Sequence, residues 1–183
     1  MIIMINGAFG VGKTSVAMGL IQHVNNSMIY DPEEVGFMLR NIINKGIRRK
    51  GEDADDFQDL ELWRKLTVQI AKDLIDTYKM NLIIPMTIYR KEYFDYICRG
   101  FKEIDRDTYH FCLTSSLDTI HKRLESRGDA AGSWAYLQTL KAMQAYNEYD
   151  FNEYINTENC TVNEIVSIIS KIVNDNLYNS VLE

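Results

Sequence analysis

The feature that most constrains this chain is a glycine-rich loop near its N-terminus. It has the pattern G-x-x-x-x-G-K-T and comprises Gly7, Ala8, Phe9, Gly10, Val11, Gly12, Lys13 and Thr14. An apolar run at residues 2–5 precedes the loop, and apolar residues at helical spacing follow it at residues 15–24. Strand, glycine-rich turn and helix form the context that a phosphate-binding loop requires. The glycines let amide N–H groups turn toward an anion, and the start of the helix adds partial positive charge.

The residue types in this loop predict specific contacts with a nucleotide. We expect all eight residues of the loop to bind ATP. The Lys13 ammonium should meet the β- and γ-phosphates during binding and catalysis, and the Thr14 hydroxyl should bind Mg²⁺. A glycine-rich turn without a ligand is the alternative interpretation.

Length, charge and cysteine usage exclude several classes of protein. A chain of 183 residues suits one domain, residues 1–183. The formal net charge of −6 argues against an extended nucleic-acid surface. No apolar run approaches the ~20 residues of a transmembrane segment. Three widely spaced cysteines suggest neither a zinc site nor a disulfide framework, and the N-terminus leaves no room for a signal peptide, so we expect a cytoplasmic protein.

The rest of the chain alternates short apolar runs with helical periodicity. We expect strands at residues 2–5, 27–30, 81–87, 109–114 and 152–157. We expect helices at residues 15–24, 32–43, 58–79, 91–103, 116–127 and 133–146, and from 161 onward with a frayed tail beyond Asn174. This alternation predicts an α/β fold with a parallel sheet covered on both faces. Pro85 should end its strand, and the polar segment 44–56 should be mobile on the acceptor side.

Ligands of such a sheet bind beyond the carboxyl ends of its strands. Asp31 follows the second strand, and we expect it to bind the acceptor and to take its hydroxyl proton in catalysis. Asp31 should also cap the next helix, and the two roles are compatible. Glu33 and Glu34 are expected to be first-turn acids that favour the helix dipole, and they are weaker candidates than Asp31 for binding Mg²⁺ or for acting as the base. Arg40 should anchor the acceptor, although a solvated arginine is an equal alternative.

Two residues just past the third strand complete the predicted acceptor site. Thr87 and Arg90 stand where an ATPase motor carries an aspartate for Mg²⁺, and no carboxylate follows before Glu92. This favours a small-molecule kinase over an ATPase motor.

A pair of arginines predicts a lid. Arg123 and Arg127 are four residues apart and share a helix face, just before a glycine-flanked segment. We expect a lid at about residues 128–147 to deliver these two catalytic arginines to the phosphates while it excludes water. A solvent-facing pair beside Glu125 is the alternative. An aromatic acceptor pocket is also expected from Tyr136, Tyr146, Tyr149 and Tyr154.

Four blocks of sequence resemble a known family. They are residues 5–14 (INGAFGVGKT), 30–40 (YDPEEVGFMLR), 84–88 (IPMTI) and 133–135 (SWA). These blocks look like the tunicamycin-resistance ATP-binding proteins, within the P-loop nucleoside/nucleotide-kinase-like superfamily, and the similarity spans residues 1 to about 173.

This resemblance implies a three-layer fold with a five-stranded parallel sheet in the order 2-3-1-4-5. It implies ATP binding at residues 7–14, and a cleft at Asp31, Arg40 and Thr87 for a nucleoside-like ligand. Arg123 and Arg127 match the paired arginines that open the lid of nucleotide kinases.

Three functions fit these residues. The first is a Mg·ATP-dependent phosphotransferase that acts on a small-molecule acceptor, with a nucleoside antibiotic such as tunicamycin as an example. The second is an ATP-binding protein that sequesters its ligand without turnover. The third is a nucleoside or nucleotide kinase. A carboxylate at Asp31 together with lid arginines favours the enzyme, since a pure binder would not need them. A homodimer is left open.

Overall fold

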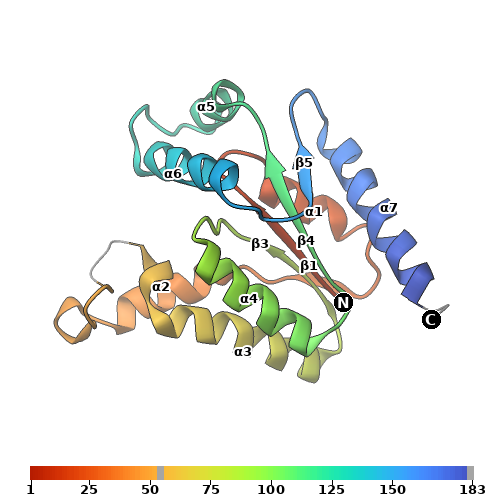
Figure 1. The fold of residues 1–183 in the computed structure, drawn as a ribbon, viewed down its shortest axis with the longest axis horizontal. Coiled ribbons are helices and arrows are strands. Elements are labelled where there is room, and N and C mark those ends of the chain that lie inside the picture. The colour runs from red at the N-terminus through yellow and green to blue at the C-terminus, as the bar shows by residue number, and fades with distance from the viewer. Residues whose placement is uncertain (53–55, 181–183) are drawn as a thin grey trace.

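Five parallel strands form the central layer of the structure (Figure 1). The computed structural model describes residues 1–52 and 56–180. The strands are β1 (Ile2–Gly7), β2 (Ser27–Ile29), β3 (Asn81–Pro85), β4 (Thr108–Thr114) and β5 (Tyr154–Asn156). Their order in the sheet is β2-β3-β1-β4-β5, and every neighbouring pair is parallel. The predicted fold class and strand order are therefore confirmed, as is the end of β3 at Pro85.

Helices cover both faces of this sheet. They are α1 (Lys13–Leu20), α2 (Pro32–Ile42), α3 (Glu61–Tyr78), α4 (Lys91–Ile104), α5 (Leu117–Ser126), α6 (Trp134–Glu148) and α7 (Val162–Ser180). α1 packs against α7 on one face, and α3 packs against α4 on the other (Figure 1). The apolar runs of β1 and β3 are continuous because helices bury both sides of these strands.

One buried polar side chain connects the middle strand to the segment after β3. Asn6 is fully buried, and its Nδ2 donates to the Ile88 carbonyl at 3.0 Å. Its Oδ1 accepts from the Ile88 amide at 2.8 Å and from the Gly7 amide at 2.8 Å. The Tyr146 hydroxyl donates to the same oxygen at 3.1 Å. Asn6 therefore fixes where the P-loop begins relative to β3 and α6.

Two predicted segments differ from the structure or extend beyond it. The last helix does not fray after Asn174 but continues to Ser180, because Val173 and Leu177 still pack against the core. The segment 44–56 contains a short 3₁₀ helix, η1 (Lys45–Ile47), and leads into η2 (Phe57–Asp59). Residues 53–55 of that segment lie outside the described residues, and its mobility stays a prediction.

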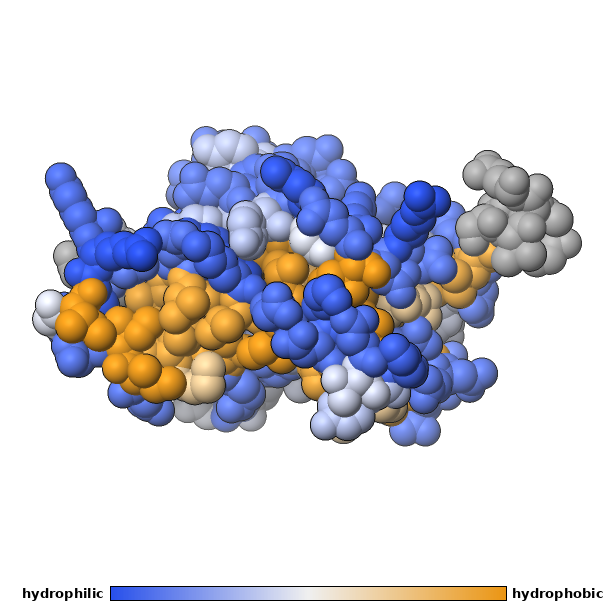
Figure 2. Space-filling model, turned by 90° about the horizontal axis from the view of Figure 1, so that it is seen from below, coloured by the Kyte–Doolittle hydropathy of each residue, from blue (hydrophilic) through white to orange (hydrophobic). Residues whose placement is uncertain are grey.

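Apolar side chains gather on one end of the molecule. Figure 2, seen from below, shows them at the end where α2, η1 and the start of α3 lie. The exposed large apolar residues of these elements are Phe37, Met38, Ile42, Ile47 and Leu62, and we call them the α2–α3 apolar face. Within the described ranges, no helix combines the length and the apolar character needed to cross a membrane.

Candidate functional site

The P-loop turns sharply at three glycines in the left-handed region of backbone space. Their φ angles are +146° at Gly7, +79° at Gly10 and +109° at Gly12. A Cβ at Gly7 would lie 2.6 Å from the Leu113 carbonyl oxygen, whereas a Cβ at Gly12 would meet open space. Gly12 also ends the loop without a side-chain cap on α1, so the first amides of α1 stay available to an anion.

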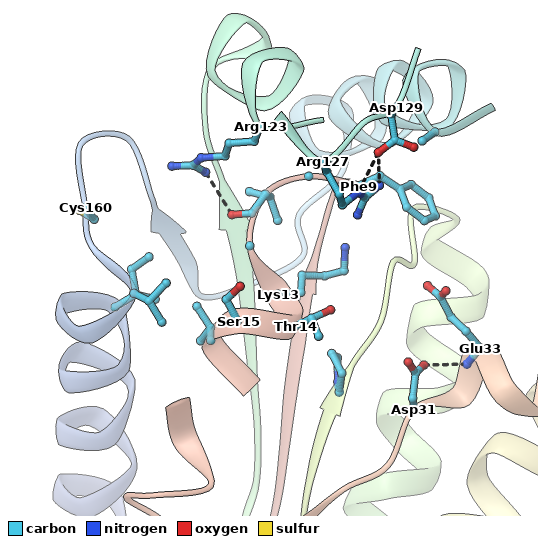
Figure 3. A pocket seen from close by; sticks show the side chains of 18 of the residues that line it. Phe9, Lys13, Thr14, Ser15, Asp31, Glu33, Arg123, Arg127, Asp129 and Cys160 are labelled. Atoms are coloured by element: carbon cyan, nitrogen blue, oxygen red, sulfur yellow. Dashed lines mark hydrogen bonds and ion pairs between the residues drawn. The ribbon is translucent and has the colours of Figure 1, made fainter. Parts of the chain in front are cut away.

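A cavity of about 870 Å³ opens in front of this loop (Figure 3). The start of α2, the α5–α6 connection and the start of α7 form its other walls. The predicted site residues that line it are Phe9, Gly10, Val11, Gly12, Lys13, Thr14, Asp31, Arg123 and Arg127. Glu33, the weaker candidate, lines it as well, and the lining residues without a predicted role are Ser15, Val16, Pro85, Asp129, Trp134, Ala135, Cys160, Thr161, Val162 and Ile165. Gly7 and Ala8, at the start of the predicted ATP-binding loop, do not line the cavity, whereas the other predicted nucleotide-binding residues and the predicted catalytic residues lie together around it.

Lys13 is folded back over the loop that precedes it. Its Nζ donates to the Ala8 carbonyl at 2.9 Å and lies 5.3 Å from the centre of the Phe9 ring. Burial lowers the pKa of Lys13 from 10.5 to about 8, and the Glu33 carboxylate is the strongest group that opposes this shift. A poorly solvated ammonium at the cavity wall favours an anionic ligand.

Two carboxylates enter the cavity from the start of α2. The Asp31 carboxylate accepts from the Glu33 amide at 2.9 Å, which confirms the predicted helix cap. Burial raises the pKa of both Asp31 and Glu33. Sequence reasoning ranked Glu33 as a helix-dipole residue, but its carboxylate points into the cavity (Figure 3). Its first-turn position at the carboxyl edge of the sheet was the signal that could have found it.

The paired arginines lie on the same side of the cavity but have different partners. The Arg123 guanidinium donates to the Val11 carbonyl and to the hydroxyl and carbonyl of Thr157, each at 3.1 Å. It therefore connects the P-loop to the segment after β5. Arg127 instead pairs with Asp129, two residues on, at 2.7 Å (Figure 3). Asp129 is a second cavity residue that sequence reasoning missed.

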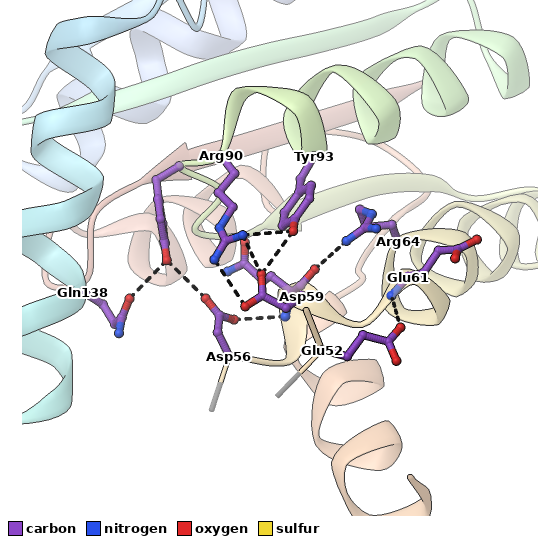
Figure 4. Close-up of polar contacts among 10 residues, drawn as sticks. Glu52, Asp56, Asp59, Glu61, Arg64, Arg90, Tyr93 and Gln138 are labelled. Carbon is purple, nitrogen blue, oxygen red and sulfur yellow. Dashed lines mark hydrogen bonds and ion pairs between the residues drawn. The ribbon is translucent and has the colours of Figure 1, made fainter. Parts of the chain in front are cut away.

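The remaining predicted acceptor residues do not line this cavity. Arg90 pairs with the buried carboxylate of Asp59 at 2.8 Å, and Tyr93 donates to the same carboxylate at 3.1 Å (Figure 4). Thr87 is buried and its carbonyl accepts from Gln58. The Arg40 guanidinium lies 5.9 Å from the centre of the Phe57 ring. Their roles in acceptor binding stay predictions.

The four tyrosines of the predicted aromatic pocket do not line this cavity, and that pocket stays a prediction. Tyr146 is buried with its hydroxyl on Asn6, and Tyr136 bonds to Glu125. The aromatic wall is formed by Phe9 and Trp134, whose ring centres are 5.1 Å apart. A tyrosine on a helix or strand can face either the core or a cavity, and its position in the sequence does not show which.

The arrangement matches a known family over most of the chain. Residues 2–149 match the AAA domain family. The chain belongs to this family. No curated protein sequence matches the chain.

Solved structures extend the comparison to nearly the whole chain. The tunicamycin resistance protein of Deinococcus radiodurans is 25% identical, with a TM-score of 0.75 over 94% of each chain. The thymidylate kinase of Candida albicans is 17% identical, with a TM-score of 0.64 over 96% of this chain and 91% of that one. The shikimate kinase of Aquifex aeolicus is 15% identical, with a TM-score of 0.56 over 97% and 99%. These likenesses confirm the resemblance to the tunicamycin-resistance proteins and the kinase-like fold.

The residues present fit ATP and Mg²⁺. A Cβ at Gly12 would meet open space, so the backbone there leaves room for a ligand, and the Lys13 ammonium lies at the wall of the same cavity. The described residues contain no cluster of three or more His, Cys, Asp or Glu side chains able to hold a metal. Mg²⁺ in kinases is bound by phosphates, waters and one or two protein oxygens, and the Thr14 hydroxyl at the cavity wall would be such an oxygen.

Proposed function

We propose that this protein is a Mg·ATP-dependent phosphotransferase that acts on a hydroxyl group of a small molecule. The observation that carries this proposal is that one cavity is lined by the P-loop with Lys13 on one side and by the Asp31 and Glu33 carboxylates on another. Bound Mg·ATP would supply the phosphoryl group. A phosphate-binding wall facing a carboxylate wall is the arrangement that transfer to a hydroxyl needs.

Each side chain has a role in this proposal. Residues 7–14 bind the ATP phosphates, Lys13 neutralises the terminal charge and Thr14 contributes the metal-binding hydroxyl. Asp31 orients the acceptor and belongs to the pair of carboxylates that handles its proton. Arg127 meets transferred charge once it leaves Asp129, and Arg123 holds the P-loop in register. Arg40, Thr87 and Arg90 contribute to the acceptor side.

The acceptor class is proposed from similarity. Because the Deinococcus radiodurans neighbour carries the name tunicamycin resistance protein, a nucleoside antibiotic such as tunicamycin is the first acceptor to test. Binding of such a ligand without turnover, and a nucleoside or nucleotide kinase, are the alternatives. We further propose that the protein acts in the cytoplasm, where Mg·ATP is available and free thiols such as Cys98 and Cys112 stay reduced.

A calorimetric experiment tests the nucleotide site. Lys13→Ala should weaken binding of Mg·ATP by at least ~10-fold and change AMP binding little, because the lysine meets only the terminal phosphates. Equal affinities of wild type and variant for ATP would contradict the assignment of residues 7–14. Mass spectrometry of tunicamycin incubated with protein and Mg·ATP then separates the functions. A phosphorylated product supports transfer, and tight binding without product supports sequestration.

A further inference from the structure

The two carboxylates at the start of α2, Asp31 and Glu33, differ in the hydrogen bonds that they accept. Asp31 Oδ1 accepts the Glu33 amide at 2.9 Å, so Asp31 is held against the first turn of its own helix. The Glu33 carboxylate accepts no hydrogen bond from any residue in the described ranges. Figure 3 shows it extending past Asp31 toward the side of the cavity where Lys13, Phe9 and Arg127 lie.

Charged groups from several elements act on Glu33. Lys13 from the P-loop and Arg127 from the end of α5 favour its charged form, whereas Asp31 and Asp56 disfavour it. Burial is the largest influence and raises the pKa of Glu33. The Glu33 carboxylate interacts with the lysine expected at the terminal phosphate, and it is directed toward that lysine (Figure 3).

We propose that Glu33, and not Asp31, takes the proton of the acceptor hydroxyl. This inference rests on the proposed phosphotransferase function and assigns a catalytic residue within the same cavity. Asp31 is then a positioning residue, because its cap fixes the backbone of Glu33.

The reaction balances with this assignment. The acceptor oxygen forms a bond to the γ-phosphorus while the bond from that phosphorus to the β,γ-bridging oxygen breaks. The electron pair of the broken bond leaves with ADP. The hydroxyl proton passes to a Glu33 carboxylate oxygen and later to solvent, so phosphorylated acceptor, ADP and one proton are formed.

Three single variants separate the two carboxylates. Glu33→Gln removes the base, Asp31→Asn keeps a cap oxygen, and Glu34→Gln changes an exposed neighbour in the same turn as a control. Each is assayed with Mg·ATP and tunicamycin for phosphorylated product, and with Mg·ATP alone for ADP released to water. We expect Glu33→Gln to lower kcat at least ~10²-fold with ATP affinity within ~2-fold, and Asp31→Asn to lower kcat far less. The acidic limb of the wild-type pH profile of kcat should disappear only in Glu33→Gln.

The outcomes distinguish this inference from the function on which it rests. If wild type makes product or ADP and Glu33→Gln is equally fast, Glu33 is not the base and the phosphotransferase stands. If wild type forms neither product nor ADP while it binds Mg·ATP, the phosphotransferase itself fails, and Glu33 has no proton to accept.

Discussion

Burial of one lysine makes the stability of the protein depend on pH. The pKa of Lys13 is about 8 in the folded chain, against an ordinary 10.5. Below pH 8 both states carry the charge, so the full cost of burying it opposes folding. Between about pH 8 and 10.5 the unfolded chain holds more protons than the folded one, so this cost falls as pH rises. The difference of about 2.5 units between the two values corresponds to roughly 3 kcal/mol.

We therefore predict that Lys13→Met raises the free energy of unfolding at pH 7 by roughly 3 kcal/mol. The gain should shrink as pH rises from 8 to 10.5. Urea unfolding at several pH values measures it, with the exposed Lys171→Met as the matched control. A gain that is the same at pH 7 and pH 10.5 would show that Lys13 is not desolvated.

Sequence patterns predicted site residues that are recognised by their spacing along the chain. They did not predict residues that belong to the site only because their side chains point into the cavity. The loop at residues 7–14 was predictable because strand, glycines and lysine are adjacent in the chain. Asp129 and Cys160 were not predicted and Glu33 was ranked below Asp31, because each reaches the cavity only through the way its element packs. Asp31 was placed correctly as a cap, since an Asp before Pro in a first turn is a local signal.

The two arginines of α5 should behave differently, although they share a helix face. Arg123→Gln leaves the Val11 and Thr157 acceptors without a charged donor, which we expect to lower the free energy of unfolding by about 2 kcal/mol without nucleotide. Arg127→Gln removes an ion pair in which Arg127 is exposed, so stability should stay within ~0.5 kcal/mol while ATP affinity falls. Thermal unfolding and calorimetry on both variants measure these effects. Equal losses of stability would contradict the difference.

The contacts of α6 limit which residues of the predicted lid can move without breaking hydrogen bonds. Residues 139–146 of α6 are attached to the P-loop and to β1, since Thr139 donates to the Phe9 carbonyl at 3.2 Å and Tyr146 donates to Asn6. The turn before α6 carries Gly128 and Gly132, both with positive φ and open space around them. A movement of residues 128–147 as one unit would break the α6 contacts, whereas a movement of the turn would not.

We predict that hydrogen exchange slows on Mg·ATP binding at residues 127–134 and changes little at residues 139–146. The second range is already bonded to the P-loop and β1 in the protein without nucleotide. Exchange followed by mass spectrometry, with and without saturating Mg·ATP, resolves the two ranges. Equal slowing in both would mean that all of α6 closes.

At the level of elements, alternation of strands and helices was enough to predict the parallel sheet. Strand order was implied by family resemblance, because alternation does not by itself determine which strands are neighbours. The predicted helix at 58–79 begins as η2, and a break at Leu60 separates it from α3. Leu60 is buried and has extended backbone angles, so core packing overrides a periodic pattern that continues across it.

At the scale of the molecule, the α2–α3 apolar face is an exposed apolar surface that indicates an interaction with another protein chain. Ile42 and Ile47 are 64% and 65% exposed, and monomers rarely expose several large apolar side chains side by side. Charges of both signs lie beside this face, where Glu61 pairs with Arg49 at 2.6 Å and with Lys65. A two-fold axis places such a face against its own copy. The apolar side chains of the two copies can then pack together, and acidic side chains of one copy can lie beside basic side chains of the other.

We therefore propose a homodimer through this face, and predict a solution mass near twice the 21.3 kDa of one chain. Ile42→Glu with Ile47→Glu should give a monomer, because a two-fold interface brings each new carboxylate toward its symmetry copy. Ile168→Glu, at an exposed apolar position of α7, should leave the dimer intact. Light scattering after size exclusion measures all three proteins. A monomeric wild type at tens of micromolar, or a dimer that survives the double substitution, would show that this face is not the interface. Since α2 carries Asp31 and Glu33 at its other end, a dimer would also hold the carboxylate wall of the cavity in place.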